Sequence, residues 1–517
     1  MSTMVLQDSQ SQKIKIVFGP PGTGKTTHLL GVVEAALQRG IPPDRIGYFA
    51  FTKKAAREAI TRAMEKFDLD RKSFKYFRTL HSMAFLMLGL KNSDVMDDDD
   101  YRAVSDYVQI KLINPNKSVD DLGVSTPQDP YLKIIDQAKI KNVSLSNEFV
   151  SSGEHIQGGF EKLQQIASGL KKYKTKHSKF DFTDMIVEFN KQKSCPRFEI
   201  VIIDEAQDLS FIQWQMAEIL IRNSKEAYIA GDDDQAIFDW AGADTKRLGL
   251  IGGQREILTQ SYRVPRAVHQ VAGALINRVQ DRVQKNWNPK EEEGIVRRHR
   301  VRFNNQIDLT NGSWLVLART NYILDQIADD LRYQGLFYEY KNRSSISDRM
   351  IRAIQGWNNL KEGNEIDVST VQDIYYYMSG NGNIEHGHKE AIKTASDEVK
   401  YNYESLVVNH GLNADINSDW NIALDRIPES MQRYINAALR RSSFNSSKNI
   451  KLSTIHASKG GEADNVMVLT DLPRKADLSL SQKRDDERRV FYVATTRAKK
   501  SLHIIESQSN REFKELL

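Results

Sequence analysis

The sequence has almost no cysteine, since Cys195 is the only one among 517 residues. A single cysteine can neither form an internal disulfide nor build a cysteine zinc site, which excludes a disulfide-stabilised secreted domain and a zinc finger. Long apolar runs are missing as well, and no stretch approaches the roughly 18 apolar residues of a membrane span. Residues 1–12 are polar and lack the apolar core of a signal peptide. These absences predict a protein of a reducing, cytoplasmic compartment that does not contact membranes.

A strong excess of charge of one sign is also absent. Lys and Arg total 73 against 68 Asp and Glu, which gives a net charge of +5. Two local runs stand out, an acidic one at 97–100 and a basic one at 171–179. Such runs are usually solvated faces, and we interpret both in that way. The length is sufficient for several domains.

Short apolar runs recur along the chain and alternate with helical patterns. Continuous apolar strands between helices indicate parallel sheets that are covered on both faces. We therefore predict an α/β fold with two α/β units. The predicted strands are 14–18, 46–51, 199–204 and 227–230 in the first unit, and 314–318, 451–455, 466–469 and 502–505 in the second.

Two stretches between these runs have a different character. The first is polar and contains both charge runs, and the second is rich in Asn, Ser and Tyr. Neither contains sheet-like apolar runs, so we predict two mostly helical insertions. The predicted domains are 1–87 with 180–258 and 259–345 with 447–517, and the insertions are 88–179 and 346–446.

The first predicted strand leads directly into a phosphate-binding motif. Residues 19–26 (GPPGTGKT) fit the pattern G-x-x-x-x-G-K-[ST] between a strand and a helix. In this pattern backbone N–H groups cradle the phosphates, Lys25 reaches the β and γ oxygens, and Thr26 can ligate Mg²⁺. A Gly/Pro-rich turn without function is the alternative, and the flanking strand and helix disfavour it. The predicted cofactor-binding residues here are Gly19, Pro20, Pro21, Gly22, Thr23, Gly24, Lys25, Thr26 and Thr27.

An acidic pair follows the third predicted strand, in the segment VIIDEAQD at 201–208. A carboxylate at the end of an apolar strand can hold Mg²⁺, and a second beside it can polarise the attacking water. We assign Asp204 to the metal and Glu205 to the base, and we interpret Asp208 as structural. Acidic residues that merely end a strand are the alternative. The phosphate-binding loop favours nucleotide hydrolysis instead.

Seven segments after the phosphate-binding loop, the acidic segment among them, resemble in order the motifs of superfamily 1 helicases of the UvrD/PcrA/Rep type. They are FAFTKKAARE (49–58), TLHS (79–82), DEAQD (204–208), GDDDQAIFDWAG (231–242), QSYR (260–263), TIHASKGGE (454–462) and ERRVFYVATTRA (487–498). The resemblance implies two RecA-like P-loop domains, each with an insertion, with nucleotide in the cleft between them and single-stranded nucleic acid across the top. The compact length would suit a phage or mobile-element enzyme.

The resemblance also implies roles for residues outside the phosphate loop. Gln235 would sense the γ-phosphate and couple it to the strand track. Arg263 and Arg497 would act as arginine fingers, for which surface ion pairing is the alternative. Tyr262 would stack on the nucleotide base, Glu462 would lie near the ribose, and Gly460 would also bind the nucleotide. The predicted catalytic set is Lys25, Asp204, Glu205, Gln235, Arg263 and Arg497.

Residues for holding a strand follow from the same resemblance. Phe51 and Trp240 occupy its stacking positions, and Thr79, His81 and His456 occupy positions that touch the strand backbone or relay. Stacking a base on an aromatic ring contributes roughly 1–3 kcal/mol and tolerates any sequence. For Phe51 a core aromatic at a strand end is the alternative.

Three departures from the family pattern stand out. The stretch before the first strand leaves little room for the glutamine motif that reads adenine, and Thr27 stands where an arginine is common, so we expect looser base selectivity. Residues 506–511 leave little room for the hairpin wedge of larger relatives. Opening a duplex costs about 1.4 kcal/mol per base-pair step. A motor without a good wedge would translocate well and unwind poorly.

The sequence therefore predicts an ATP- and Mg²⁺-dependent helicase that moves 3′ to 5′ on single-stranded DNA and acts at single/double-strand junctions. A nucleic-acid-stimulated ATPase or clamp without efficient unwinding is the first alternative, and an unrelated P-loop kinase or GTPase is the second. RNA stays open as a substrate because stacking residues do not test a 2′-hydroxyl. The residues identify no protein loading partner.

Overall fold

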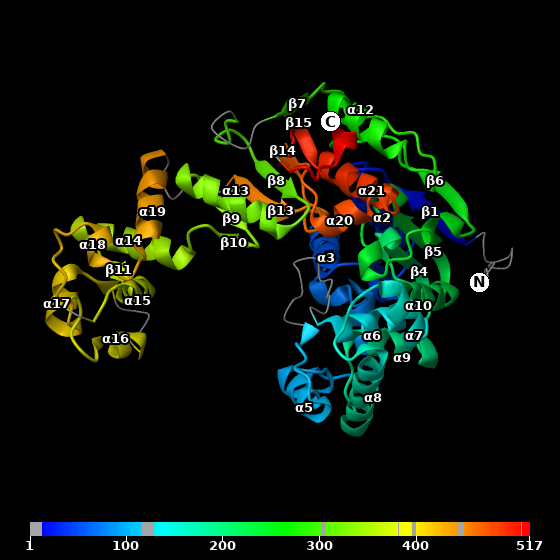
Figure 1. The fold of residues 1–517 in the computed structure, drawn as a ribbon, viewed down its shortest axis with the longest axis horizontal. Coiled ribbons are helices and arrows are strands. Elements are labelled where there is room, and N and C mark those ends of the chain that lie inside the picture. The colour runs from blue at the N-terminus through cyan, green and yellow to red at the C-terminus, as the bar shows by residue number, and fades with distance from the viewer. Residues whose placement is uncertain are drawn as a thin grey trace. The chain divides into compact units, whose positions relative to one another are not determined.

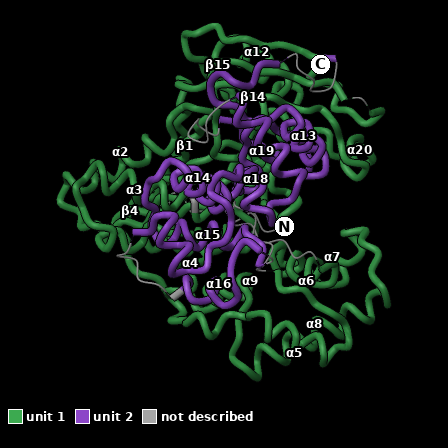
Figure 2. The backbone as a smooth tube through the Cα atoms, turned by 90° about the vertical axis from the view of Figure 1, so that its left-hand side faces the viewer, with its two compact units in different colours: residues 1–299, 455–517 green, residues 300–454 purple. Residues whose placement is uncertain are grey.

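The chain divides into two compact units. Unit 1 comprises residues 1–299 with 455–517, and unit 2 comprises residues 300–454 (Figures 1 and 2). The structure is a computed structural model that describes residues 13–115, 129–300, 307–380, 382–394, 400–441, 449–507 and 509–517. All of the residues predicted to bind nucleotide or strand belong to unit 1.

A six-stranded parallel sheet forms the centre of unit 1, with the order β3-β2-β4-β5-β1-β6. Its apolar strands point alternate side chains to opposite faces, as Ile16 and Val17 do, because successive strand residues face opposite ways. Both faces must therefore be covered. The strands are β1 (Ile14–Phe18), β2 (Ile46–Ala50), β3 (Phe77–Thr79), β4 (Phe198–Asp204), β5 (Ser224–Gly231) and β6 (Gln254–Ile257).

Helices cover the two faces of this sheet. Buried residues of α2 and α3 pack on the face of Val17, and buried residues of α4, α9 and α10 pack on the face of Ile16. Thr52 caps α3 by accepting a hydrogen bond from the N–H of Ala55 at 3.1 Å, so that helix begins directly after β2. These covering helices are α2 (Lys25–Gln38), α3 (Lys53–Phe67), α4 (Leu80–Met87), α9 (Phe182–Gln192) and α10 (Phe211–Arg222). Unit 1 also contains α11 (Arg247–Leu250) and α12 (Arg266–Ile276).

The first insertion is helical and has its own apolar core. It contains α5 (Asp98–Val108), α6 (Pro130–Ile140), α7 (Leu145–Ser152) and α8 (Gly159–His177). The acidic run begins α5 and the basic run ends α8, where each charge complements the helix dipole. Their interpretation as solvated faces is wrong for Asp100, which is 5% exposed, and for Lys174, whose side chain is 11% exposed. Both are buried because they form ion pairs.

The last part of unit 1 adds three parallel strands in the order β14-β15-β7. Residues 490–495 at the end of α21 are buried, so this helix is a core element. The elements are β7 (Ile295–His299), β14 (Ala463–Leu469), α20 (Arg474–Ser479), α21 (Arg484–Thr495) and β15 (Ala498–Ile505).

Unit 2 contains strands in the order β10-β9-β13-β8 and a helical part around the buried side chain of Trp357. β8, β9 and β13 run parallel, and β10 runs antiparallel to β9. The strands are β8 (Trp314–Ala318), β9 (Tyr338–Tyr340), β10 (Arg343–Ser344), β11 (Ile366–Asp367), β12 (Lys400–Tyr401) and β13 (Ile450–Thr454). The helices are α13 (Asn321–Tyr333), α14 (Asp348–Lys361), α15 (Val368–Tyr377), α16 (His388–Ala391), α17 (Tyr403–His410), α18 (Trp420–Ala423) and α19 (Glu429–Arg441).

The predicted fold class is confirmed: parallel sheets form the α/β cores, and the two insertions are mostly helical. Every predicted apolar run lies on a strand, and most of the strands begin or end a few residues away from the predicted bounds. The proposed domain boundaries stay a prediction. Within the described ranges, no helix combines the length and the apolar character that crossing a bilayer requires.

Candidate active site

The phosphate loop joins β1 to α2, and its backbone conformation and close contacts require glycine at two positions. Gly22 and Gly24 have φ of 74° and 80°, a left-handed conformation that favours glycine. A Cβ at Gly22 would lie 2.4 Å from Cβ of Arg263, so a side chain there would displace the arginine. Gly24 is the N-cap of α2 and offers no side-chain acceptor, which leaves N–H groups of the first turn for an anion.

Lys25, the first residue of α2, points back to the carboxylate of Glu205. Its Nζ lies 3.2 Å from Oε1 of Glu205 and donates a hydrogen bond to the carbonyl of Gly19 at 3.3 Å. Burial alone would lower the pKa of Lys25, but nearby carboxylates, Glu205 first among them, raise it above its ordinary value. The ammonium group is therefore charged and available for phosphate oxygens.

Asp204 and Glu205 follow one another at the end of β4 but differ in proton affinity. Asp204 accepts a hydrogen bond from the hydroxyl of Tyr48 at 2.7 Å, and burial, with the charge of Glu205, raises its pKa to about 6. Burial would also raise the pKa of Glu205, but Lys25 and Lys459 outweigh it and lower the pKa to about 2. Different neighbours thus give two adjacent carboxyl groups different pKa values, which allows them to take different roles.

Gln235 and Arg497 meet in the interior of unit 1. Nη2 of Arg497 donates to Oε1 of Gln235 at 2.9 Å, and Nε donates to the carbonyl of Val493 at 2.9 Å. Nε2 of Gln235 donates to Oδ2 of Asp232 at 2.7 Å. Arg497 is 2% exposed, and burial together with Arg263 lowers its pKa to about 9. Surface ion pairing is thus wrong for Arg497, because its side chain is in the core.

The other predicted nucleotide residues surround the opening of the site. Nε of Arg263 donates to Oε2 of Glu462 at 2.6 Å, and Lys499 pairs with Oε1 of Glu462 at 2.6 Å. The N–H of Tyr262 donates to the carbonyl of Gly22 at 2.9 Å, while the residue as a whole is 76% exposed. Its predicted role, stacking on a nucleobase, stays a prediction.

A cavity of about 430 Å³ joins these groups. Every residue predicted for nucleotide binding or catalysis lines it, except Gly19, whose carbonyl instead holds Lys25. The predicted residues along its wall are Pro20, Pro21, Gly22, Thr23, Gly24, Lys25, Thr26, Thr27, Asp204, Glu205, Gln235, Tyr262, Arg263, Gly460, Glu462 and Arg497.

Three residues at this cavity were not predicted from the sequence. Nε2 of Gln207 donates to Oε2 of Glu205 at 2.6 Å, and its Oε1 accepts the N–H of Asp232 at 3.0 Å, so one buried amide joins two strand ends. Tyr48 orients Asp204 from β2. Lys459 pairs with Asp208 and donates to the carbonyl of Gln235 at 2.9 Å. Gln207 and Lys459 lie within recognisable motifs, which is the signal that could have revealed them.

Asp208 lines the same cavity and forms an ion pair with Lys459. Burial raises its pKa to about 7, and the ion pair with Lys459 only partly opposes this rise. Its interpretation as a structural residue stays a prediction, although its position on the cavity wall makes it a neighbour of the reacting groups.

Phe51 and Trp240 belong to one aromatic cluster with Phe238 and His456. Ring centroids are 5.6 Å apart for Phe51 and Phe238, 6.1 Å for Phe238 and Trp240, and 5.8 Å for Trp240 and His456. Trp240 lies in the 3₁₀ turn Asp239–Ala241 and is 40% exposed. An exposed ring supported by other rings is suited to stacking on a base.

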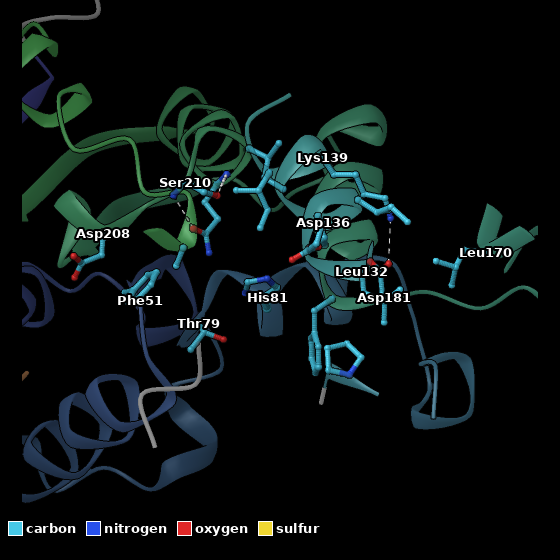
Figure 3. Close-up of a pocket in the computed structure, with 18 of the residues that line it drawn as sticks. Phe51, Thr79, His81, Leu132, Asp136, Lys139, Leu170, Asp181, Asp208 and Ser210 are labelled. Atoms are coloured by element: carbon cyan, nitrogen blue, oxygen red, sulfur yellow. Dashed lines mark hydrogen bonds and ion pairs between the residues drawn. The ribbon is translucent and has the colours of Figure 1, made fainter. Parts of the chain in front are cut away.

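Thr79 and His81 lie at a second, smaller cavity of about 160 Å³, which Phe51 also lines (Figure 3). Thr79 caps α4 by accepting from the N–H of Ser82 at 3.2 Å. Burial, with the nearby charge of Lys53, lowers the pKa of His81 to about 4, so its imidazole is neutral at pH 7. Phe51 and Asp208 line both cavities. The predicted strand residues thus form two groups that share Phe51.

Two family models match the chain, and together they cover more than half of it. The UvrD/REP helicase N-terminal domain matches residues 5–251, and the UvrD-like helicase C-terminal domain matches residues 429–509. The first of these ranges contains the phosphate loop, Asp204, Glu205 and Gln235, and the second contains Arg497.

Individual relatives carry helicase names. A probable DNA helicase II homolog of Mycoplasma genitalium is 24% identical over 95% of this chain and 82% of its own length. The ATP-dependent DNA helicase PcrA of Staphylococcus aureus is 24% identical over 54% of this chain and 41% of its own length. A solved structure of PRRSV helicase matches 97% of this chain and 54% of that chain, with 9% identity and a TM-score of 0.33.

The motifs, their meeting around one cavity and the two family models agree. The chain belongs to the UvrD-like family, as a superfamily 1 helicase of the UvrD/PcrA type.

Proposed function

We propose that this chain is an ATP-dependent DNA helicase that moves 3′ to 5′ on single-stranded DNA and opens duplex ahead of it. One observation carries the coupling: Gln235 accepts a hydrogen bond from Arg497, and Trp240 follows five residues later with an exposed ring. A change at the γ-phosphate can therefore reach the strand platform through one short segment. The DNA substrate comes from the relatives' names, and the direction comes from the family resemblance alone.

The residues present fit Mg²⁺ and ATP. The carboxyl group of Asp204 is buried and lines the cavity next to Glu205, and a divalent cation there would offset the cost of burying the two carboxylates together. Thr26 follows Lys25 at the start of α2 and also lines the cavity. Thr26 and Asp204 would hold Mg²⁺, which neutralises charge on the phosphates.

The chain's own groups divide the work of hydrolysis. Glu205 is ionised at neutral pH and can accept a hydrogen bond from the attacking water. Lys25, Arg263 and Arg497 place positive charge around the transferring phosphoryl group, which is where negative charge must be stabilised. Nε2 of Gln207 donates a hydrogen bond to Oε2 of Glu205 at 2.6 Å, which holds the carboxylate in one orientation.

A second candidate is a nucleic-acid-stimulated ATPase or clamp that translocates or binds without efficient unwinding. After β15, the described residues 506–507 and 509–517 form loops, an isolated bridge of Glu512 to Asp471 and one 3₁₀ turn (Lys514–Leu516). These residues contain no hairpin that could act as a wedge. Strand displacement measured beside ATP hydrolysis separates the two candidates.

The testing experiment is steady-state ATP hydrolysis with and without a single-stranded DNA oligonucleotide. We expect strong stimulation by the strand and loss of turnover by orders of magnitude in Glu205→Gln, which should still bind ATP. Trp240→Ala should weaken strand binding and stimulation while basal hydrolysis stays near normal. An RNA oligonucleotide of the same sequence tests the substrate class. Turnover that ignores DNA and RNA alike would refute the motor and favour another P-loop hydrolase.

A further inference from the structure

A buried lysine, Lys285, contacts the segment that carries Gln235. Lys285 belongs to the connection between α12 and β7, and its side chain is 0% exposed. Its Nζ lies 2.5 Å from Oδ1 of Asp233, 3.0 Å from Oδ2 of Asp234 and 3.1 Å from Oδ1 of Asp232. One ammonium group thus faces three consecutive carboxylates that precede Gln235.

Consecutive carboxylates in a protein interior repel one another and are costly without cations. Asp232 and Asp234 are 0% exposed and Asp233 is 4% exposed. Arg282 supplies a second cation, with Nε 2.7 Å from Oδ1 and Nη2 2.5 Å from Oδ2 of Asp234. This two-point contact satisfies Asp234, so Lys285 is the cation in contact with Asp232 among the described ion pairs.

The two oxygens of Asp232 connect Lys285 to Gln235. Oδ1 faces Nζ of Lys285, and Oδ2 accepts the hydrogen bond from Nε2 of Gln235 at 2.7 Å. A carboxylate accepts only, so it selects the NH₂ end of the carboxamide. The oxygen end of Gln235 is then turned to Nη2 of Arg497 at 2.9 Å. A reversed carboxamide would present donors to a guanidinium that also only donates.

We infer that Lys285 is a positioning residue for hydrolysis, which acts by holding the Asp232 carboxylate so that the carboxamide of Gln235 faces Arg497. The inference deepens the proposed function and rests on it, since Arg497 is assigned there to the phosphoryl group. Lys285 does not line the nucleotide cavity. It therefore acts on turnover through Gln235 and not through nucleotide contact.

The first test replaces Lys285 with methionine, which has similar length and no charge, in the full chain. We expect kcat for strand-stimulated ATP hydrolysis to fall at least 20-fold, with KM for ATP within 3-fold of the parent. The matched control is Lys225→Met, an exposed lysine of unit 1 paired with Glu199 at 2.8 Å, which should leave both constants unchanged. A Lys285→Met enzyme with normal kcat, or with a raised KM alone, would overturn the inference.

A double-mutant cycle separates positioning from general destabilisation. If Lys285 acts through Gln235, adding Lys285→Met to Gln235→Ala should change kcat by less than 3-fold, because the carboxamide is already gone. Losses that multiply would mean that Lys285 acts independently of Gln235 and would refute the mechanism.

If Lys285→Met does not fold, Lys285→Met with Asp233→Asn keeps the test decisive. This pair removes one cation and one carboxylate. Within the described part of the chain, Asp233 makes no hydrogen bond to the side chain of Gln235. Asp233→Asn alone should keep kcat within 3-fold, whereas the double variant should show the 20-fold loss; equal rates for the two would refute the inference. If single-stranded DNA does not stimulate the parent enzyme, the proposed function is refuted and not the role of Lys285. The same double-mutant cycle, measured on basal ATP hydrolysis, would then test the role of Lys285.

Discussion

Individual side chains at this site owe their properties to two or three neighbours. The carboxyl groups of Asp204 and Glu205 are adjacent in sequence, yet Glu205 faces Lys25 at 3.2 Å while Asp204 faces the neutral hydroxyl of Tyr48 at 2.7 Å. The charged neighbour stabilises the ionised form, and the neutral one does so much less. Proton affinity at this strand end is therefore set by what the neighbouring strands and helices bring to it.

His81 gives a prediction at the same scale. Its pKa of about 4 in the folded chain lies below the ordinary value of 6.5 because burial disfavours the charged ring. Between those values the unfolded chain binds a proton that the folded chain does not, so the free energy of unfolding of unit 1 falls as the pH falls from 6.5 toward 4. We expect urea unfolding at pH 7 and pH 5 to show a smaller difference for His81→Gln than for the parent.

The control for this prediction is His155→Gln, which changes an exposed histidine of unit 1. It should keep the parent's dependence on pH. An unchanged pH dependence in His81→Gln would show that other groups cause it.

Motif residues could be predicted from the sequence because their spacing identifies them, as for Lys25, Asp204 and Glu205. Lys285 could not be predicted, since it lies in the polar segment QKNWNPK (284–290), which is typical of a loop. The three aspartates that contact Lys285 are about 50 positions earlier in the chain. Only the folded structure brings such partners together, and pattern analysis of one sequence does not detect them.

Some strands could also be predicted from the sequence pattern, whereas others form only because of their packing in the sheet. β1 and β4 are mostly apolar, apart from Lys15, Glu199 and Asp204, because most of their residues are buried, and this pattern predicts them. β6 and β7 contain exposed polar residues and lie at sheet ends, so their sequences, QREI and IVRRH, resemble loops. Edge strands need only one neighbour, which weakens their signal in the sequence.

The helices α6, α8 and α9 supply a prediction about stability. Lys139 of α6 and Lys174 of α8 both contact Asp181 and Asp184 at the start of α9. Removing one cation leaves two partly buried carboxylates with a single lysine. We expect Lys174→Met to lower the free energy of unfolding by about 3 kcal/mol, the lower end for breaking a buried ion pair.

Denaturant unfolding checks this value against Lys172→Met, which removes an exposed lysine from the same helix. Lys172→Met should change stability by less than about 0.5 kcal/mol, as surface substitutions usually do. Equal effects of the two variants would contradict the role of the ion-pair network.

On the scale of the whole molecule, the apolar core around Trp357 is made of unit 2 residues, and the cores on the two faces of the six-stranded sheet are made of unit 1 residues. The nucleotide cavity is lined by residues of unit 1. Units with their own cores can unfold separately. We expect calorimetry to show two transitions, and ATP with Mg²⁺ to raise only the transition of unit 1.

Glu205→Gln is the suitable protein for this measurement because it should hold ATP without consuming it. Ligand at 100 times its Kd stabilises the binding state by about 2.7 kcal/mol. Lys25→Ala should show no such rise. A single transition, or a rise in both, would mean that the units do not unfold independently.

The wall shared by the two cavities has a thermodynamic consequence. Phe51 and Asp208 each line the nucleotide cavity and the smaller cavity beside Thr79 and His81. An occupant of one cavity that shifts either side chain changes the affinity of the other cavity, and linkage requires the two effects to be equal. A small compound that fills the space beside His81 could then inhibit without competing with ATP, and saturating ATP would change that compound's Kd by the same factor.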